Sequence, residues 1–187
     1  MNAACGTLSI FLCLNYIYTR DPKYIWWALG MIPAALIADA LDGWVARKTG
    51  KFSRIGADLD SLADIISFGV APAVLGFTFG MRGGWDVIVL VYFVVCGISR
   101  LARFNVTAEE LADEESGKVK YFEGTPIPSS VILVAILAYA FHSGAVHEGL
   151  WFGQTRIAGP WWFHPIVLMY GLSGSAMISA TLRIPKP

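Results

Sequence analysis

The chain has 187 residues, of which 56% are hydrophobic and only 15% are charged, and its mean hydropathy is +0.57. A composition this apolar excludes an ordinary soluble domain and predicts a protein of the membrane. Basic and acidic residues number 14 each, so the net charge of zero offers no bulk attraction to nucleic acid, and no nucleic-acid partner is predicted.

Six apolar segments follow one another along the chain, and we predict that each forms a membrane helix. They span residues 2–19, 24–47, 55–79, 84–104, 127–141 and 161–182. The predicted fold is therefore all-α and polytopic, with six transmembrane helices in a single domain over residues 1–187. The first apolar run, residues 3–18, would reach only about 24 Å as a helix, against a hydrocarbon core of ~30 Å. We therefore expect the natural protein, or its first helix, to begin upstream of Met1.

Four aspartates cluster where the second predicted helix ends and the third begins. On helices, Asp39 and Asp42 are i,i+3 neighbours and Asp60 and Asp64 are i,i+4 neighbours, so each pair shares a helix face. A carboxylate in the middle of a membrane costs ~3 kcal/mol on insertion scales, and four together also repel each other. Hard divalent cations bound by carboxylate oxygens would compensate this charge. The sequence therefore predicts two Mg²⁺ or Mn²⁺ ions held by these four aspartates.

Small and basic residues surround the aspartates. Gly43 follows Asp42 directly, Ala46 lies one helical turn from it, and Gly56 lies one turn before Asp60. Small residues on the acidic faces let a bulky ligand approach the backbone and the metals. Four basic residues fill the connecting loop: Arg47, Lys48, Lys51 and Arg54. Metal ions beside a basic loop suit a phosphorylated ligand, and more specifically a diphosphate.

The basic residues also predict an orientation. If the aspartate loop faces the cytosol, alternating helices place ten lysines and arginines on that side and four on the other. This excess supports six spans with the aspartates at the cytosolic face. The other side collects aromatic residues and histidines, which we interpret as an interfacial belt: Trp26, Trp27, Trp85, Trp151, Trp161, Trp162, His142, His147 and His164.

The fourth predicted helix closes with Arg100 and Arg103, which are i,i+3 neighbours on one face and reach the same side as the aspartates. Two interpretations stay open. The arginines anchor the helix at the membrane surface, or they clamp a carboxylate, which arginine binds through two hydrogen bonds. Asn105 adds a further donor and acceptor, and an alcohol that carries a carboxylate is serine. Residues 121–130, YFEGTPIPSS, then form a stiff, extended turn before the fifth helix.

The spacing of the aspartates and their neighbours resembles a known signature. The pattern Asp39-x2-Asp42-Gly43-x2-Ala46-Arg47-x8-Gly56-x3-Asp60-x3-Asp64 is similar to that of the CDP-alcohol phosphatidyltransferases, with all eight fixed positions matched. The stretches RLARFN, FEGTPIPS and DSLADIISFGVAPA resemble the phosphatidylserine synthases of this family. The resemblance runs over nearly the whole chain, from about Asn2 to the closing TLRIPKP.

This resemblance implies the fold of the CDP-alcohol phosphatidyltransferases and the transfer of a phosphatidyl group from CDP-diacylglycerol to L-serine, with release of CMP. It implies that the positions of Asp39 and Asp60 bridge two metal ions. The position of Asp42 completes one metal site and that of Asp64 the other, and Asp64 is also the implied base. The expected serine-binding residues are Arg100, Arg103 and Asn105.

The resemblance also implies which residues bind the lipid substrate, and it implies the oligomeric state and the membrane. Gly43, Arg47 and Ser53 match family positions that contact the CDP-lipid head, and Asn2 matches an asparagine near the start of the first helix. The expected CDP-diacylglycerol site comprises Asn2, Asp42, Gly43, Ala46, Arg47, Ser53 and Gly56. The family implies a homodimer in the lipid bilayer. The membrane is that of the endoplasmic reticulum if the chain is fungal, and the plasma membrane if it is prokaryotic.

Two alternatives to a serine phosphatidyltransferase remain open from the sequence. Enzymes with the same signature use phosphorylated acceptors, glycerol 3-phosphate or inositol phosphate, which Arg100 and Arg103 could bind equally well. A divalent cation transporter would also place carboxylates in a membrane. Against transport, the acids gather at one face and do not line a path across the bilayer.

Overall fold

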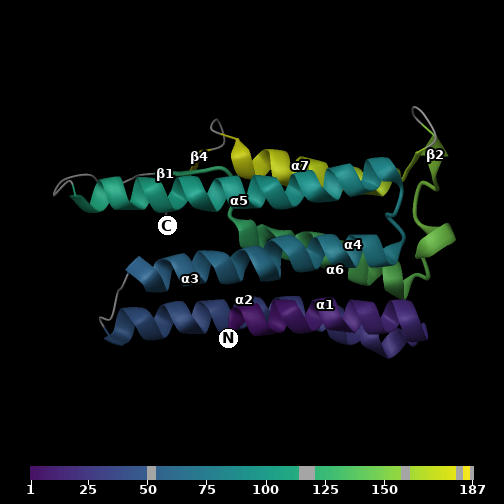
Figure 1. Cartoon of the computed structure of the whole chain (residues 1–187), viewed down its shortest axis with the longest axis horizontal. Helices are drawn as coiled ribbons and strands as arrows, with labels where there is room; N and C mark the ends of the chain where they lie inside the picture. The colour runs from purple at the N-terminus through teal and green to yellow at the C-terminus, as the bar shows by residue number, and fades with distance from the viewer. Residues whose placement is uncertain (50–53, 114–120, 157–160, 180–182, 186–187) are drawn as a thin grey trace.

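Figure 1 shows a bundle of helices that share one long axis, in a computed structural model of the chain. The structure describes residues 1–49, 54–113, 121–156, 161–179 and 183–185. The main helices are α1 (Asn2–Thr19), α2 (Pro22–Thr49), α3 (Arg54–Asp64), α4 (Ala71–Phe79), α5 (Gly84–Asp113), α6 (Val131–His142) and α7 (Leu168–Ile178). A π-helix, η1 (Ile65–Val70), joins α3 to α4, and three short 3-10 helices complete the set: η2 (Ile127–Ser130), η3 (His147–Gly149) and η4 (Pro165–Val167).

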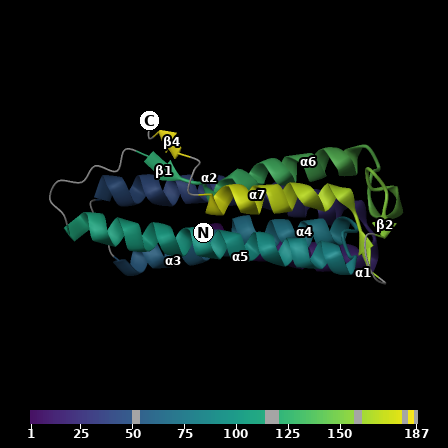
Figure 2. The ribbon, with the colours of Figure 1, turned by 90° about the horizontal axis from the view of Figure 1, so that it is seen from above.

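The helices pair along their lengths. The chief contacts of α1 are with α2, and those of α5 are with α7, which run side by side in Figure 2. The core between them contains fully buried aromatic side chains, among them Phe68, Phe93 and Tyr170. The Tyr170 hydroxyl donates to the carbonyl of Pro72 at 2.7 Å, which fixes α7 against α4.

The predicted helices are present, with three corrections. The helix predicted over 84–104 continues to Asp113 as α5. The expectation of a helix over 161–182 was wrong at both ends, since α7 covers only Leu168–Ile178. Pro165 explains its late start, because a residue before proline avoids the helical region and His164 accordingly has φ −105° and ψ 115°. The connections also contain short antiparallel pairs that an all-α prediction omitted: β1 (Tyr121–Glu123) with β4 (Arg183–Pro185), and β2 (Thr155–Arg156) with β3 (Trp162–Phe163).

The outer surface fits an integral membrane protein. Three stretches are long and apolar enough to cross a bilayer: Pro22–Val45, Ile55–Phe79 and Gly84–Val106. Two shorter apolar helices, Ile127–His142 and Pro165–Ile178, accompany them. Large apolar side chains point outward along the bundle, with Leu62 63% and Leu172 72% exposed, as expected of a surface that faces lipid. The count of six spans stays a prediction.

The π-helix changes the course of the third predicted span. Pro72 has no backbone N–H, so an α-helical hydrogen bond to the carbonyl of Phe68 is impossible. The turn widens instead, and the N–H of Ala71 bonds to the carbonyl of Ile66, five residues back. Such widened turns are often found at functional sites, and this one begins directly after Asp64.

The first helix lies unusually close to this π-helix. A Cβ atom on Gly6 would lie 2.5 Å from Ser67 Oγ and 2.7 Å from Ser67 Cα, so only glycine permits the approach. The Ser67 hydroxyl donates to the carbonyl of Asn2 at 3.0 Å. The contact therefore places the first turn of α1 beside Asp64.

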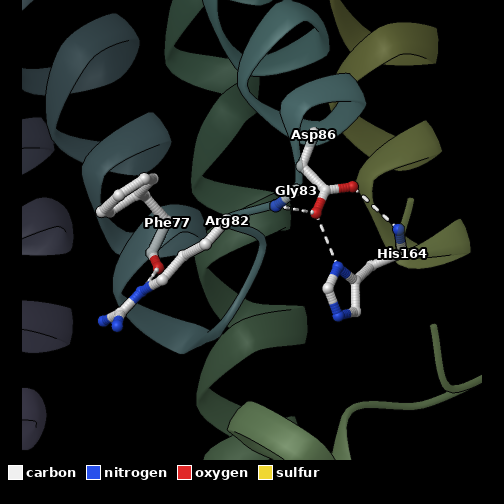
Figure 3. A network of polar contacts seen from close by, with 5 residues as sticks. All are labelled: Phe77, Arg82, Gly83, Asp86 and His164. Carbon is white, nitrogen blue, oxygen red and sulfur yellow. Dashed lines mark hydrogen bonds and ion pairs between the residues drawn. The ribbon is translucent and has the colours of Figure 1, made fainter. Parts of the chain in front are cut away.

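A buried polar cluster joins α5 to the start of α7 at the opposite end of the bundle (Figure 3). Asp86 is fully buried, and its Oδ2 accepts from the N–H of Gly83 at 2.9 Å and lies 2.6 Å from His164 Nδ1. Its Oδ1 accepts from the N–H of His164 at 2.8 Å. His164 is only 7% exposed, so its ring packs inside the protein at this end of the bundle, and its place in an interfacial belt stays a prediction. Arg82, in the same turn, donates from Nε to the carbonyl of Phe77.

We expect Asp86→Ala to lower the free energy of unfolding by about 3 kcal/mol or more, because it leaves buried donors without an acceptor. For a chain of this size that corresponds to a melting temperature about 6–12 °C lower, measured by thermal unfolding in detergent. Asp21→Asn is the control at the same end, because it removes the exposed ion pair with Lys23, keeps an oxygen for the N–H of Lys23, and should affect the melting temperature little. Equal melting temperatures for the two variants would contradict the anchoring role of Asp86.

Candidate active site

The four predicted aspartates do gather, at the end of the bundle where α2 and α3 meet. Asp39 is close enough to Asp60 for a hydrogen bond between the two carboxyl groups, and its charge also interacts with that of Asp42. Asp64 interacts with both Asp39 and Asp60. Asp39 and Asp64 are partly buried, whereas Asp42 and Asp60 are exposed. The cluster thus has an inner pair and an outer pair of acids.

The donor chemistry of this cluster fits a hard divalent cation. Its side chains offer only carboxylate oxygens, the ligands that Mg²⁺ and Mn²⁺ prefer. In the part of the chain that the structure describes, no three acids, histidines or cysteines already converge on a metal-sized site. Neighbouring like charges repel one another, so a bound cation would draw the carboxylates inward. The set of residues therefore suits such an ion in identity and charge, and the number of ions stays a prediction.

Asn2 holds the innermost aspartate. Its side-chain Nδ2 donates to Asp64 Oδ1 at 2.7 Å, and Asn2 itself is only 2% exposed. The close packing of Gly6 on Ser67, one turn further along α1, brings Asn2 to this position. Asn2 was predicted to contact the CDP-lipid directly. The structure gives it a partner of its own, one that orients the carboxylate of Asp64.

The two arginines of α5 have different environments. The charge of Arg100 interacts with that of Asp64, and its side chain lies over the ring of Phe104. Arg103 instead donates from Nη2 to the carbonyl of Ile178, the last residue of α7, at 3.1 Å. The i,i+3 spacing predicted the common face, but only Arg100 turns toward the acids. A role of either arginine in binding serine stays a prediction.

Asn105 connects α5 to α3. Its Oδ1 accepts from the Ser61 hydroxyl at 3.1 Å, and its Nδ2 donates to Asp58 Oδ1 at 3.3 Å. Both ends of the amide are therefore engaged within the protein. A contact with serine would have to replace one of these bonds, and the predicted role of Asn105 is untested.

The remaining predicted residues divide into two groups. Gly43 lies in α2 beside Asp42, and Gly56 lies in the first turn of α3, one turn before Asp60. The side chains of Ala46 and Arg47, and the whole of Ser53, lie outside the described residues. Contacts of all five with a CDP-lipid stay predictions.

Sequence reasoning missed several buried polar atoms near this end. Among the described residues, four side-chain atoms are buried and lack a hydrogen-bond partner: Asn2 Oδ1, Arg100 Nε, Thr125 Oγ1 and Ser130 Oγ. A buried group left without a partner costs ~1–3 kcal/mol. The proline-rich stretch around Thr125 and Ser130 has the composition of a surface loop, so no sequence signal indicated that Ser130 is fully buried.

Comparison with known proteins gives a consistent assignment. The family model described as CDP-alcohol phosphatidyltransferase matches residues 1–173. A CDP-diacylglycerol–serine O-phosphatidyltransferase from Saccharomyces cerevisiae is 44% identical over 188 residues, covering 100% of this chain and 68% of that protein. An archaetidylserine synthase from Methanothermobacter thermautotrophicus is 38% identical, covering 72% of this chain and 53% of that protein.

A third relative is a bacterial protein. The CDP-diacylglycerol–serine O-phosphatidyltransferase of Helicobacter pylori is 40% identical over 133 residues, covering 68% of this chain and 52% of that protein. The chain thus spans about two thirds of the yeast relative and about half the length of the archaeal and bacterial ones.

Proposed function

The chain belongs to the CDP-alcohol phosphatidyltransferase family, and we propose that it transfers the phosphatidyl group of CDP-diacylglycerol to the hydroxyl of L-serine. The products are phosphatidylserine and CMP. The observation that carries this proposal is the environment of Asp64, which is held by Asn2, faced by Arg100 and grouped with the other acids. The similarity to enzymes named as serine phosphatidyltransferases supports serine as the acceptor.

The metal-binding role falls to the four aspartates. Asp39, Asp42, Asp60 and Asp64 would hold two Mg²⁺ or Mn²⁺ ions, with Asp39 and Asp60 shared between them, as their mutual approach supports. When bound, the ions neutralise charge on the diphosphate and on the departing CMP.

Asp64 accepts the proton. The serine hydroxyl oxygen attacks the phosphorus of the phosphatidyl group, the bond from that phosphorus to the oxygen of CMP breaks, and the serine proton passes to the Asp64 carboxylate. Asn2 keeps this carboxylate in one orientation by bonding to Oδ1, which leaves Oδ2 for the proton. The positive charge of Arg100 nearby stabilises the ionised carboxylate before the transfer.

The lipid substrate lies along the acidic faces of α2 and α3. We place the CDP head group against Gly43, Ala46 and Gly56, where small residues leave room for it. Arg47 and Ser53 would bind its phosphates, with Asp42 and Asn2 at the edge of the site. The basic residues at the end of α2, at the start of α3 and between them provide the positive charge that a diphosphate requires.

The proposed setting is a bilayer with this end of the bundle at the cytosolic face, in the endoplasmic reticulum or the plasma membrane. The ten-to-four distribution of lysine and arginine supports that orientation. At the other end, aromatic contacts such as Trp85 with Trp161 and Trp26 with Phe141 suit a membrane–water interface. We further propose a homodimer, as the family resemblance implies.

The test is release of CMP by the purified protein in detergent with CDP-diacylglycerol and Mn²⁺ or Mg²⁺. L-serine, glycerol 3-phosphate, inositol and inositol phosphate are offered in parallel. We expect release that depends on serine, with phosphatidylserine formed in equal amount, and loss of release on chelation of the metal. CMP release with a phosphorylated alcohol in place of serine would contradict serine as the acceptor. The proposed transfer of the phosphatidyl group would still stand. Flux of Mn²⁺ into liposomes without any CMP release would favour the transporter alternative.

A further inference from the structure

Two hydroxyl groups and one guanidinium nitrogen are buried without hydrogen-bond partners in α5 and in the segment that leads into α6. They are Thr125 Oγ1, Ser130 Oγ and Arg100 Nε, within the part of the chain whose side chains are described. Buried polar atoms in proteins almost always have a hydrogen-bond partner, so each exception needs an explanation. Three such atoms lie on two segments that pack together. They therefore indicate a polar ligand that would supply the missing hydrogen bonds.

Thr125 packs beside the last turn of α7. Its N–H donates to the carbonyl of Ala176 at 3.1 Å. The preceding Gly124 has φ +74° and lies so close to the carbonyl of Met177 that no side chain would fit. Arg103 reaches the same turn through the carbonyl of Ile178. Figures 1 and 2 both show β1, which leads into this segment, near the end of α7. Thr125 is therefore held by main-chain contacts close to the arginine-bearing part of α5.

Ser130 lies where η2 meets both α5 and the π-helix. The side chain of Ile127, in the same short helix, occupies the space beside Gly97, where a Cβ would lie 2.8 Å from Ile127 Cδ1 and 3.6 Å from Ile65 Cδ1. Arg100 is one turn beyond Gly97 on the same face of α5. Asp64 directly precedes Ile65. The contact of Ile127 with Gly97 and Ile65 therefore brings η2 to the junction between Arg100 and Asp64.

We propose that Thr125 and Ser130 bind the acceptor alcohol, and that with Arg100 they form a site for a free amino acid. This inference rests on the proposed transfer to serine. A free amino acid carries a carboxylate, which needs donors, and an ammonium group, which needs acceptors. Arg100 Nε donates to the carboxylate, and the two hydroxyls, which can donate or accept, bind the remaining polar atoms. One guanidinium with two neutral hydroxyls suits a zwitterion better than a phosphate dianion.

The test compares Thr125→Val and Ser130→Ala with the wild-type protein in steady-state CMP release. We expect each variant to raise the KM for serine about tenfold or more, with the KM for CDP-diacylglycerol and the kcat at saturating serine within about twofold of wild type. Thr125→Ser keeps the hydroxyl and should restore the KM for serine. Thr78→Val is the matched control, because its buried hydroxyl already donates to the carbonyl of Val74 at 2.7 Å. That variant should leave the KM for serine unchanged.

Thermal unfolding provides a second measurement. Removing a hydroxyl that has no partner in the protein should not lower the melting temperature without serine, whereas Thr78→Val should lower it. Serine should raise the melting temperature of the wild-type protein and do so less for the two variants. An unchanged KM for serine in both variants, or equal losses for serine and CDP-diacylglycerol with lowered melting temperatures, would overturn the inference and leave the proposed function standing. Wild-type protein that releases CMP only with another alcohol would overturn both.

Discussion

Asp64→Asn should lower kcat by about a thousandfold, within the range that general base catalysis contributes, while CDP-diacylglycerol still binds. Asparagine keeps the shape of aspartate and one oxygen, so it can still accept from Asn2 Nδ2. It cannot take the proton of the serine hydroxyl at neutral pH. Single-turnover CMP release measures the chemical step, and protection of the protein against thermal unfolding by CDP-diacylglycerol measures binding.

Asp64 is also a proposed metal ligand, and the metal dependence separates the two roles. If proton transfer is its main contribution, raising Mn²⁺ far above the wild-type requirement will not restore kcat. Recovery at high Mn²⁺ would contradict the base assignment and leave Asp64 a metal ligand alone. Asp21→Asn serves as the control for an exposed aspartate at the other end of the bundle and should keep the wild-type rate.

Gly6→Ala should lower kcat/KM by about a hundredfold, although Gly6 lies one turn away from the nearest proposed site residue. The new methyl group would meet Ser67 Oγ and the backbone Cα of Ser67 at 2.5 Å and 2.7 Å. Since backbone cannot rotate out of the way, α1 must move off the π-helix and take Asn2 away from Asp64. A displacement of about 1 Å near a reacting group can cost a hundredfold in rate. The same overpacking should lower the free energy of unfolding by about 1–3 kcal/mol.

Gly30→Ala is the matched control, because it makes the same change in α2 at a position where the new Cβ would meet nothing within 4 Å beyond its chain neighbours and the backbone of its own helix. It should leave kcat/KM unchanged and raise the free energy of unfolding by about 0.5–1 kcal/mol, since alanine loses less backbone entropy in a helix than glycine. Kinetics and thermal unfolding of both variants provide the comparison. Wild-type activity in Gly6→Ala would show that the position of α1 does not matter to the reaction.

Local spacing in the sequence predicted that the aspartates share helix faces. It could not predict hydrogen bonds between residues that are far apart in the chain. Asp39, Asp42, Asp60 and Asp64 reveal their common faces through helical periodicity alone. The bond from Asn2 to Asp64 joins residues 62 apart, and that from His164 to Asp86 joins residues 78 apart. No periodicity within one element points to such a partner, so these contacts became visible only in the folded chain.

The prolines explain part of the observed helix geometry. The missing N–H of Pro72 explains why a π-helix forms, yet a proline alone does not determine which residues the widened turn includes. Pro165 ends the extended stretch before α7, and reading that stretch as apolar helix placed the start too early. For Ser130 the composition indicated an exposed turn, because burial of a polar loop depends on what packs over it.

The extra residue in the turn at Ile65–Val70 sets the rotational phase between two halves of one long helix. Each residue of an α-helix advances the side-chain direction by about 100°. The half before the turn presents Asp60 and Asp64 to the other acids, and the half after it presents Leu75 and Phe79 to the core. A chain shortened by a single residue here would keep every side chain of the site and still turn the carboxylates about 100° away from the other acids. The length of this turn is therefore as much a part of the proposed active site as the aspartates themselves.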